Sequence, residues 1–263
     1  MVNDGASDTF ARSDLRSIPQ LNDSAPYAFL TSNRGRTFIL FRNPVHGPVL
    51  RGLGLRAESL ARCAFMFLFT PNAETRLNAQ RFLLAVEDPR ALRIGIHIRV
   101  GDSAFTNKDD FLVETYIHFF DCAAQIEQDR RKPWHTRVIW YLASDSLSLR
   151  RGAKKLYGEK LLTDAKSPAV HTECASHNAS TCTRSVMKKA FQSVAADLHV
   201  LSKAQYHVVT SSGGPGQMGA WLSGEVSHPH TYVLEHEPPR KARPCSPEEA
   251  VPYERLSEIW SGK

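Results

Sequence analysis

The chain has 263 residues, of which 42% are hydrophobic and 23% are charged. This length corresponds to one large domain or two small ones, and the composition excludes disordered, collagen-like and disulfide-scaffold proteins. The formal net charge of +6 at pH 7 favours an anionic partner, such as nucleic acid, a membrane surface or a phosphate-bearing small molecule.

The sequence predicts no targeting, membrane-spanning or nucleic-acid-binding segment. Met1 to Gln20 carries charges throughout and lacks the apolar core of a signal peptide. The longest uncharged stretch, Ala204 to Gly224, is interrupted by Ser, Gly, His and Gln, which a bilayer span does not tolerate in that number. Basic clusters such as Arg130 to Lys132 are short and lack the interleaved aromatic residues that stack on bases. We therefore expect no membrane anchor in this chain and no nucleic-acid partner.

The five cysteines leave several assignments open. Cys63 lies in an apolar run and Cys122 in a helical segment, so both are predicted to be buried thiols. Cys174 and Cys182 flank a loop rich in Ser and Thr. The sequence is compatible either with a disulfide between them or with two free thiols. A zinc site is the third interpretation, although its spacing fits no standard motif and we predict no metal. Its ligands would be His171, Cys174, His177 and Cys182.

The first part of the chain predicts few regular elements. Residues 1–35 are polar and turn-rich and are expected to be a flexible lead-in. Thr37 to Phe41 predicts a short strand, and Leu60 to Phe69 predicts a helix. Glu74 to Val86 predicts a second helix, because its apolar residues recur at helical spacing.

From residue 92 onward, predicted strands alternate with predicted helices. Such alternation indicates parallel βαβ units with right-handed crossovers. The predicted fold class is therefore α/β, a Rossmann-like parallel sheet with helices on both faces. The expected strands are 93–100, 138–143, 206–210 and 231–234, and the expected helices are 111–129, 146–157, 185–203 and 218–222. The buried stripe expected on helix 185–203 consists of Phe191, Val194, Ala195, Leu198 and Leu201.

In such sheets, ligands bind beyond the carboxyl ends of the strands, and one of these ends carries His97 and Arg99. A guanidinium at the end of a buried strand needs an anionic partner, because its desolvation alone is costly. Its planar fork matches the oxygens of a diphosphate. An internal salt bridge with Asp102 or Asp145 would equally supply the anionic partner that the guanidinium of Arg99 needs.

Two further strand ends also carry polar groups. Asp145 follows an apolar strand, where it suits a ribose hydroxyl, a base edge or a positive neighbour, or caps the next helix. Ser212 and Gly213 lead into a helix whose N-terminus would attract a phosphate. The segment Gly214 to Gly219 matches G-x-G-x-x-G in letters, but it falls late in the chain and Pro215 removes a donor, which disfavours a nicotinamide site.

Several of these segments together resemble the fucosyltransferases that use GDP-fucose, most closely the α-1,6-fucosyltransferases of N-glycan cores. The likeness covers about residues 92–222. The first segment is similar to their strand ending in H-x-R-x-G/T-D, but Val100 stands where the α-1,6 enzymes carry a second Arg. Ser212 to Gln217 replaces their Ser-Ser-Gln-x-x-Arg. The similar segments are Ile94 to Asp102, Trp140 to Asp145, Asp197 to Ala204 and Val208 to Ser212.

The resemblance implies a GT-B-like glycosyltransferase that transfers fucose from GDP-fucose to a glycan or glycoprotein acceptor, with no cofactor and no metal. Arg99 would be the catalytic residue, neutralising the diphosphate as the bond to fucose C1 breaks, since a fixed positive group lowers that barrier. No acid of this sequence matches the family's proposed general base. Candidates for that role are Asp102, Asp109 and Glu114, and the sequence does not choose among them. The implied donor-binding residues are His97, Arg99, Asp145, Asp197, Ser212 and Gly213.

The same resemblance suggests a domain division and a location. After the lead-in, residues 36–91 would be a partial N-terminal, acceptor-side region, residues 92–240 the nucleotide-sugar-binding domain, and residues 241–263 a C-terminal tail. Enzymes of this kind work in the Golgi or the secretory-pathway lumen. Because the N-terminal region is short and the base is missing, the alternative is a catalytically inactive nucleotide-sugar-binding remnant.

Overall fold

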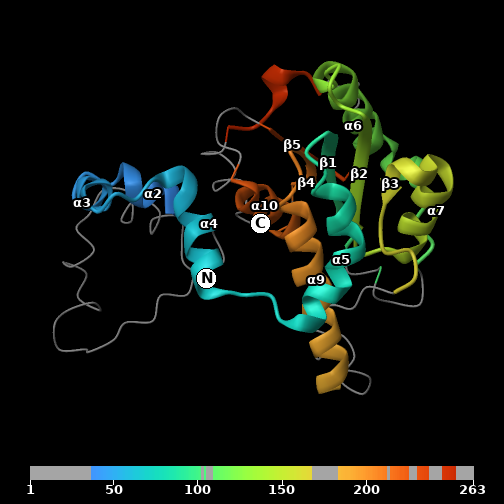
Figure 1. The fold of residues 1–263 in the computed structure, drawn as a ribbon, viewed down its shortest axis with the longest axis horizontal. Helices are drawn as coiled ribbons and strands as arrows, with labels where there is room; N and C mark the ends of the chain where they lie inside the picture. Colours follow the sequence, from blue (N-terminus) through green and yellow to red (C-terminus); the bar gives the residue numbers. More distant parts are fainter. Residues whose placement is uncertain are drawn as a thin grey trace.

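The described part of the chain is built around a five-stranded parallel sheet with the strand order β3-β2-β1-β4-β5 (Figure 1). This confirms the predicted α/β class. The strands are β1 (Ala91–Ile98), β2 (Arg137–Ser144), β3 (Leu161–Leu162), β4 (Tyr206–Thr210) and β5 (Thr231–Leu234). The computed structural model describes residues 37–101, 104, 109–167, 183–211, 214–224, 230–236 and 245–252.

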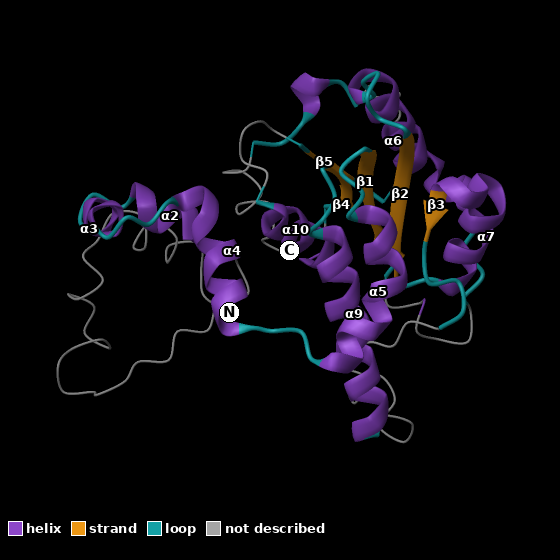
Figure 2. Ribbon diagram, viewed as in Figure 1, coloured by secondary structure: helices purple, strands orange, loops and turns teal. Residues whose placement is uncertain are grey.

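Helices cover both faces of the sheet (Figure 2). The larger core packs the Ile side chains of β1 against α6 and α7, and a second core packs β2 against α5 and α9. The α-helices are α2 (Thr37–Arg42), α3 (His46–Gly52), α4 (Ala57–Leu68), α5 (Ala73–Val86), α6 (Ile117–Arg130), α7 (Leu147–Tyr157), α9 (Arg184–Leu201) and α10 (Gly214–Ser223). Short 3₁₀ turns are η4 (Val113–Tyr116), η5 (Gly158–Lys160) and η6 (Pro247–Glu249).

The predicted strand at Thr37 to Phe41 is wrong, because these residues belong to helix α2. Aromatic and β-branched residues favour a strand only where a neighbouring strand pairs with them. Helices α2 and α3 lie to one side of the sheet, beyond α4, and away from every strand of the described residues (Figure 1). A helix satisfies its own backbone hydrogen bonds and needs no such partner.

The buried stripe predicted for helix α9 is mostly wrong. The buried residues of α9 are Ala190, Ala196, Val200 and Leu201, whereas Phe191 is 58% exposed. The N-terminal turns of α9 extend beyond the sheet, so a large apolar side chain there meets no core (Figure 1). Where α9 packs against α5, the two helices contribute the small buried residues Ala79 and Ala196 to the same core.

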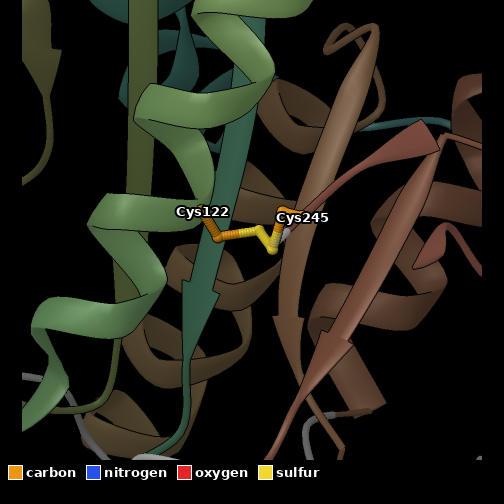
Figure 3. The surroundings of a disulfide bond; sticks show 2 residues. All are labelled: Cys122 and Cys245. Atoms are coloured by element: carbon orange, nitrogen blue, oxygen red, sulfur yellow. A yellow bond between two sulfur atoms is a disulfide. The ribbon is translucent and has the colours of Figure 1, made fainter. Parts of the chain in front are cut away.

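Both cysteine predictions need correction. Cys122 is buried as expected, but it forms a disulfide with Cys245, which ties α6 to the segment 245–252 (Figure 3). The pairing joins residues 123 positions apart, and no local pattern marks it. Cys63 is an exposed free thiol on α4. Cys174 and Cys182, with the histidines of the zinc interpretation, lie outside the described residues.

Within the described ranges, no helix has the length and apolar character that crossing a membrane requires. The same residues contain no cluster of three or more potential metal ligands. Helix α5, from the region expected at 36–91, packs on α9, from the domain expected at 92–240, as part of the second core. The domain boundaries expected from the sequence stay a prediction.

Candidate functional site

The carboxyl ends of β1 and β4 are tied together by one hydroxyl group. The side chain of Thr210, the last residue of β4, accepts a hydrogen bond of 3.0 Å from the backbone N–H of Arg99. The same hydroxyl donates a hydrogen bond of 3.1 Å to the carbonyl of His97. This arrangement fixes the backbone on both sides of Ile98, so the direction in which Arg99 leaves the sheet is set by β4.

Asp145, at the end of β2, holds the next part of the same loop. Its carboxylate accepts hydrogen bonds from the backbone N–H groups of Val100 at 2.8 Å and Gly101 at 3.3 Å, and pairs with Nε of Arg99 at 3.3 Å. Gly101 has a φ of +108°, which explains a glycine at this turn. The salt bridge between Arg99 and Asp145, one of the two partners expected from the sequence, is therefore confirmed.

The pair is only partly withdrawn from solvent. The side chain of Asp145 is 8% exposed and that of Arg99 is 28% exposed. Burial raises the pKa of Asp145, and this outweighs the opposing effects of the backbone hydrogen bonds from Val100 and Gly101 and of the Arg99 charge. The carboxylate therefore orients Arg99 from the protein side, and the arginine side chain remains partly exposed.

The helix-capping alternative for Asp145 is wrong, because other residues cap α7. Ser146 accepts a hydrogen bond from the N–H of Leu149, and Asp109 accepts four hydrogen bonds from the first turn of the helix. Burial raises the pKa of Asp109, but the hydrogen bonds from Ser146 and Ser148 outweigh it and leave the pKa lowered. A carboxylate engaged in this way is a poor general base, and the sequence carried no signal for this capping role.

His97 lies under the start of α10 and is buried. Burial, followed by the charge of Arg99, lowers the pKa of His97 to about 4, so its ring is neutral at pH 7. Among the described residues, its Nδ1 atom has no hydrogen-bond partner. Gly216 of α10 packs directly on this ring, and a Cβ at position 216 would lie 2.6 Å from the Cβ of His97. Only glycine permits this approach of α10 to β1.

Ser212 and Gly213 connect β4 to α10 and lie outside the described residues, as does Asp102. Their contact with a donor stays a prediction. Glu114, another candidate base, is exposed on η4.

Asp197 lies on α9 and faces a different part of the molecule from Arg99. It accepts a hydrogen bond of 2.6 Å from the hydroxyl of Tyr141 on β2. Burial raises the pKa of Asp197 to about 6, and the hydrogen bond from Tyr141 only partly offsets this effect. An extended chain covers about 13 Å between Tyr141 and Asp145, so Asp197 does not share one contact site with the Arg99–Asp145 pair.

A cavity of about 920 Å³ opens beside Asp197, between α5, α9 and the loop after β3. The described residues at its wall combine charged, polar and aromatic groups, and none of His97, Arg99 and Asp145 is among them. The wall includes Arg81 and Asp164, whose side chains pair at 3.0 Å. Further lining residues are Glu74, Leu77, Asn78, Phe82, Tyr141, Lys166, Ser167, Lys189, Ala190, Gln192, Ser193, Ala196 and Asp197.

Comparison with known proteins gives limited information. No family model matches the chain. No curated protein shows significant sequence similarity to it. Among solved structures, the chain is similar to a mutant of Arabidopsis thaliana FUT1 in complex with GDP, with 13% identity and a TM-score of 0.49 over 78% of this chain and 43% of that one. The chain thus spans less than half of that protein, and a likeness at this identity concerns the fold alone.

Proposed function

We propose that the protein is a glycosyltransferase that binds GDP-fucose and transfers fucose to a glycan or glycoprotein acceptor without a metal ion. The observation that carries this proposal is the Arg99–Asp145 pair at the carboxyl edge of the sheet, where Gly216 in the first turn of α10 packs on the neighbouring His97. The sugar and the acceptor class are supported by the resemblance of the strand-end motifs to fucosyltransferases.

In this proposal, Arg99 binds the diphosphate of the donor. Asp145 engages Nε of Arg99 and thereby directs the guanidinium, and the N-terminus of α10 adds a second positive pole. When the bond between fucose C1 and the diphosphate breaks, its electron pair stays on GDP. Arg99 would stabilise that charge, and because it is already oriented, it would need little reorganisation during the reaction.

The cavity beside Asp197 would receive the base of the nucleotide. The Watson–Crick edge of guanine presents N–H donors, for which a carboxylate is a complementary acceptor. Tyr141, which holds Asp197, lies about 13 Å along β2 from Asp145, so a donor that contacts both carboxylates would bind in an extended form. Asp197 and Arg99 would then hold opposite ends of one donor molecule.

The Cys122–Cys245 disulfide supports a place in the secretory pathway. Disulfides persist in oxidising compartments and are rare in the cytosol. This one is buried between α6 and the segment 245–252. Residence in the Golgi lumen is consistent with that chemistry and forms part of the proposal.

Titration of GDP into the purified protein tests donor binding. We expect Arg99→Ala to weaken GDP binding at least tenfold, whereas Arg76→Ala, which removes an exposed arginine from α5, should leave the affinity unchanged. Binding of GDP by Arg99→Ala with the affinity of the unmodified protein would contradict the assignment.

The second candidate is a nucleotide-sugar-binding protein without catalysis. It is favoured by the structural use of Asp109 and Asp145, which engages two carboxylates near the site in hydrogen bonds. Release of GDP from GDP-fucose in the presence of mixed glycan acceptors separates the two functions. A transferase releases GDP in an acceptor-dependent manner, whereas a binding protein releases none above background.

A further inference from the structure

Thr210 continues the ladder between β1 and β4 past its last backbone pair. The pairing of these strands ends at His97 and Val209. At the next position, the hydroxyl of Thr210 accepts a hydrogen bond from the N–H of Arg99 at 3.0 Å and donates one to the carbonyl of His97 at 3.1 Å. A side chain therefore takes the place of a backbone partner at the point where β1 leaves the sheet.

Asp145 does the same on the opposite side of β1. The pairing of β1 with β2 ends at Ile98 and Ser144, and the carboxylate of Asp145 then accepts the N–H of Val100 at 2.8 Å. Successive N–H groups of a strand inside a sheet point toward opposite neighbours. The backbone around Arg99 is thus fixed by one side chain from each of the two neighbouring strands.

Thr210 differs in chemistry from the residues that precede it in β4. Val208, Val209 and Thr210 are all 0% exposed, and valine is typical of a strand buried on both faces. Threonine has nearly the shape of valine but carries a hydroxyl, which is costly to bury unless it is hydrogen-bonded. Here the hydroxyl both donates and accepts, and both partners are backbone groups beside Ile98. A valine would fill the same space and leave both groups without this partner.

We propose that Thr210 is a positioning residue for the donor, whose hydroxyl fixes the direction of Arg99 so that the guanidinium meets the diphosphate. This inference rests on the proposed donor site. A side chain that is already oriented loses less freedom when the ligand binds. Asp145 directs the guanidinium at Nε, and Thr210 fixes the backbone from which the side chain starts. Because Thr210 is fully buried, it acts on the ligand only through Arg99.

The test compares the affinity of GDP, measured by calorimetric titration, with that of guanosine, measured by ligand-observed NMR. Thr210→Val keeps the shape of the side chain and removes the hydroxyl. We expect GDP to bind about fivefold to tenfold more weakly, because two hydrogen bonds that orient Arg99 are lost. Guanosine carries no phosphate for Arg99 to contact, so its affinity should be unchanged. Thr210→Ser keeps the hydroxyl and should bind GDP as the unmodified protein does.

Thr231→Val is the matched control. Thr231 is also 0% exposed in a strand, but among the described residues its hydroxyl has no hydrogen-bond partner. The same substitution therefore removes no hydrogen bond there, and it should leave the affinities of GDP and guanosine unchanged.

A double-mutant cycle shows whether Thr210 acts through Arg99. In a protein that already carries Arg99→Ala, adding Thr210→Val should weaken GDP binding no further, because the side chain that Thr210 positions is gone. Equal weakening by Thr210→Val in both backgrounds would overturn the inference. So would equal weakening of GDP and guanosine, or a Thr210→Ser variant that binds GDP as weakly as Thr210→Val.

Thr210→Ala provides a second variant in case Thr210→Val fails to fold. Its smaller side chain leaves space for a water molecule at the two backbone groups. It should weaken GDP binding in the same direction but by a smaller factor, with guanosine unchanged. Unchanged GDP affinity in the folded variants, together with weaker binding by Arg99→Ala, would remove the role of Thr210 and leave the donor site in place. If the unmodified protein does not bind GDP, the donor-site proposal itself fails and the inference falls with it.

Discussion

The hydroxyl of Tyr141 lies 2.6 Å from Oδ1 of Asp197, and this hydrogen bond joins strand β2 to helix α9 at the edge of the cavity of about 920 Å³. Tyr141 is buried, and its ring packs edge-on against Phe82 of α5. One residue thus connects the sheet to both helices of the second core, which makes the cavity wall a part of the folded framework.

Removing this hydroxyl should cost stability. In Tyr141→Phe, the carboxylate of Asp197 stays buried without its donor, and the loss of a hydrogen bond to a charged group typically costs about 1.5–3 kcal/mol. Urea denaturation at pH 7.5 measures the change in the free energy of unfolding. Tyr157→Phe, whose ring packs against Phe120, is the control and should change it by less than about 0.5 kcal/mol. A smaller loss for Tyr141→Phe than for this control would contradict the prediction.

Stability should fall as the pH is lowered below 6.5. Burial lowers the pKa of His207 to about 3 and that of His97 to about 4, so both are neutral in the folded protein and take up a proton more readily when unfolded. Their contribution is fully present above pH 6.5 and is lost progressively toward pH 3. Asp197 and Asp145, whose pKa values are raised by burial, act in the opposite direction, whereas the lowered pKa values of Asp109 and Asp164 add to the effect of the histidines.

The measurement is the free energy of unfolding at pH 7.5, 6.5, 5.5 and 4.5. His207→Gln removes one of the two histidines and should reduce the slope of stability against pH between 6.5 and 4.5. An unchanged slope in this variant would mean that His207 is not the buried neutral base that the structure indicates.

The Cys122–Cys245 disulfide should be a major source of stability. It closes a loop of more than a hundred residues, and the chain-entropy model gives about 4–5 kcal/mol for such a length. The double variant Cys122→Ala/Cys245→Ala should therefore unfold at a lower guanidinium concentration, and a reducing agent should lower the midpoint of the unmodified protein similarly. Cys63→Ala, which removes the exposed thiol, should leave the midpoint unchanged.

Gly216→Ala should disturb the donor site through packing alone. The added Cβ would come within 2.6 Å of His97, so α10 would have to move away from β1, at a cost of about 1–3 kcal/mol for overpacking. We expect lower thermal stability together with weaker GDP binding. Gly52→Ala in α3 meets nothing within 4 Å and is the control; it should leave GDP affinity unchanged. Normal GDP affinity in Gly216→Ala would separate the packing of α10 from ligand binding.

Local patterns in the sequence were sufficient for most of the sheet. The strands at 206–210 and 231–234 agree with β4 and β5, because a short apolar run between turn residues depends on its own composition. The two-residue strand β3 was missed, since Leu161 and Leu162 are too short to show a period and are defined only by pairing with β2. The strand expected at Thr37 to Phe41 is a helix instead, and none of the described strands lies beside it to pair with it.

The sequence by itself determined the α/β class and the placement of Arg99 and Asp145 after two strands, because both follow from periodicity along a short stretch of chain. Only the tertiary structure decided that these two residues pair, that Asp109 caps α7, that Asp197 faces a separate cavity and that Cys122 meets Cys245. Each of these relationships joins residues far apart in the chain. The geometry that brings them together comes from the order of the strands and the packing of helices on the sheet, which no local pattern encodes.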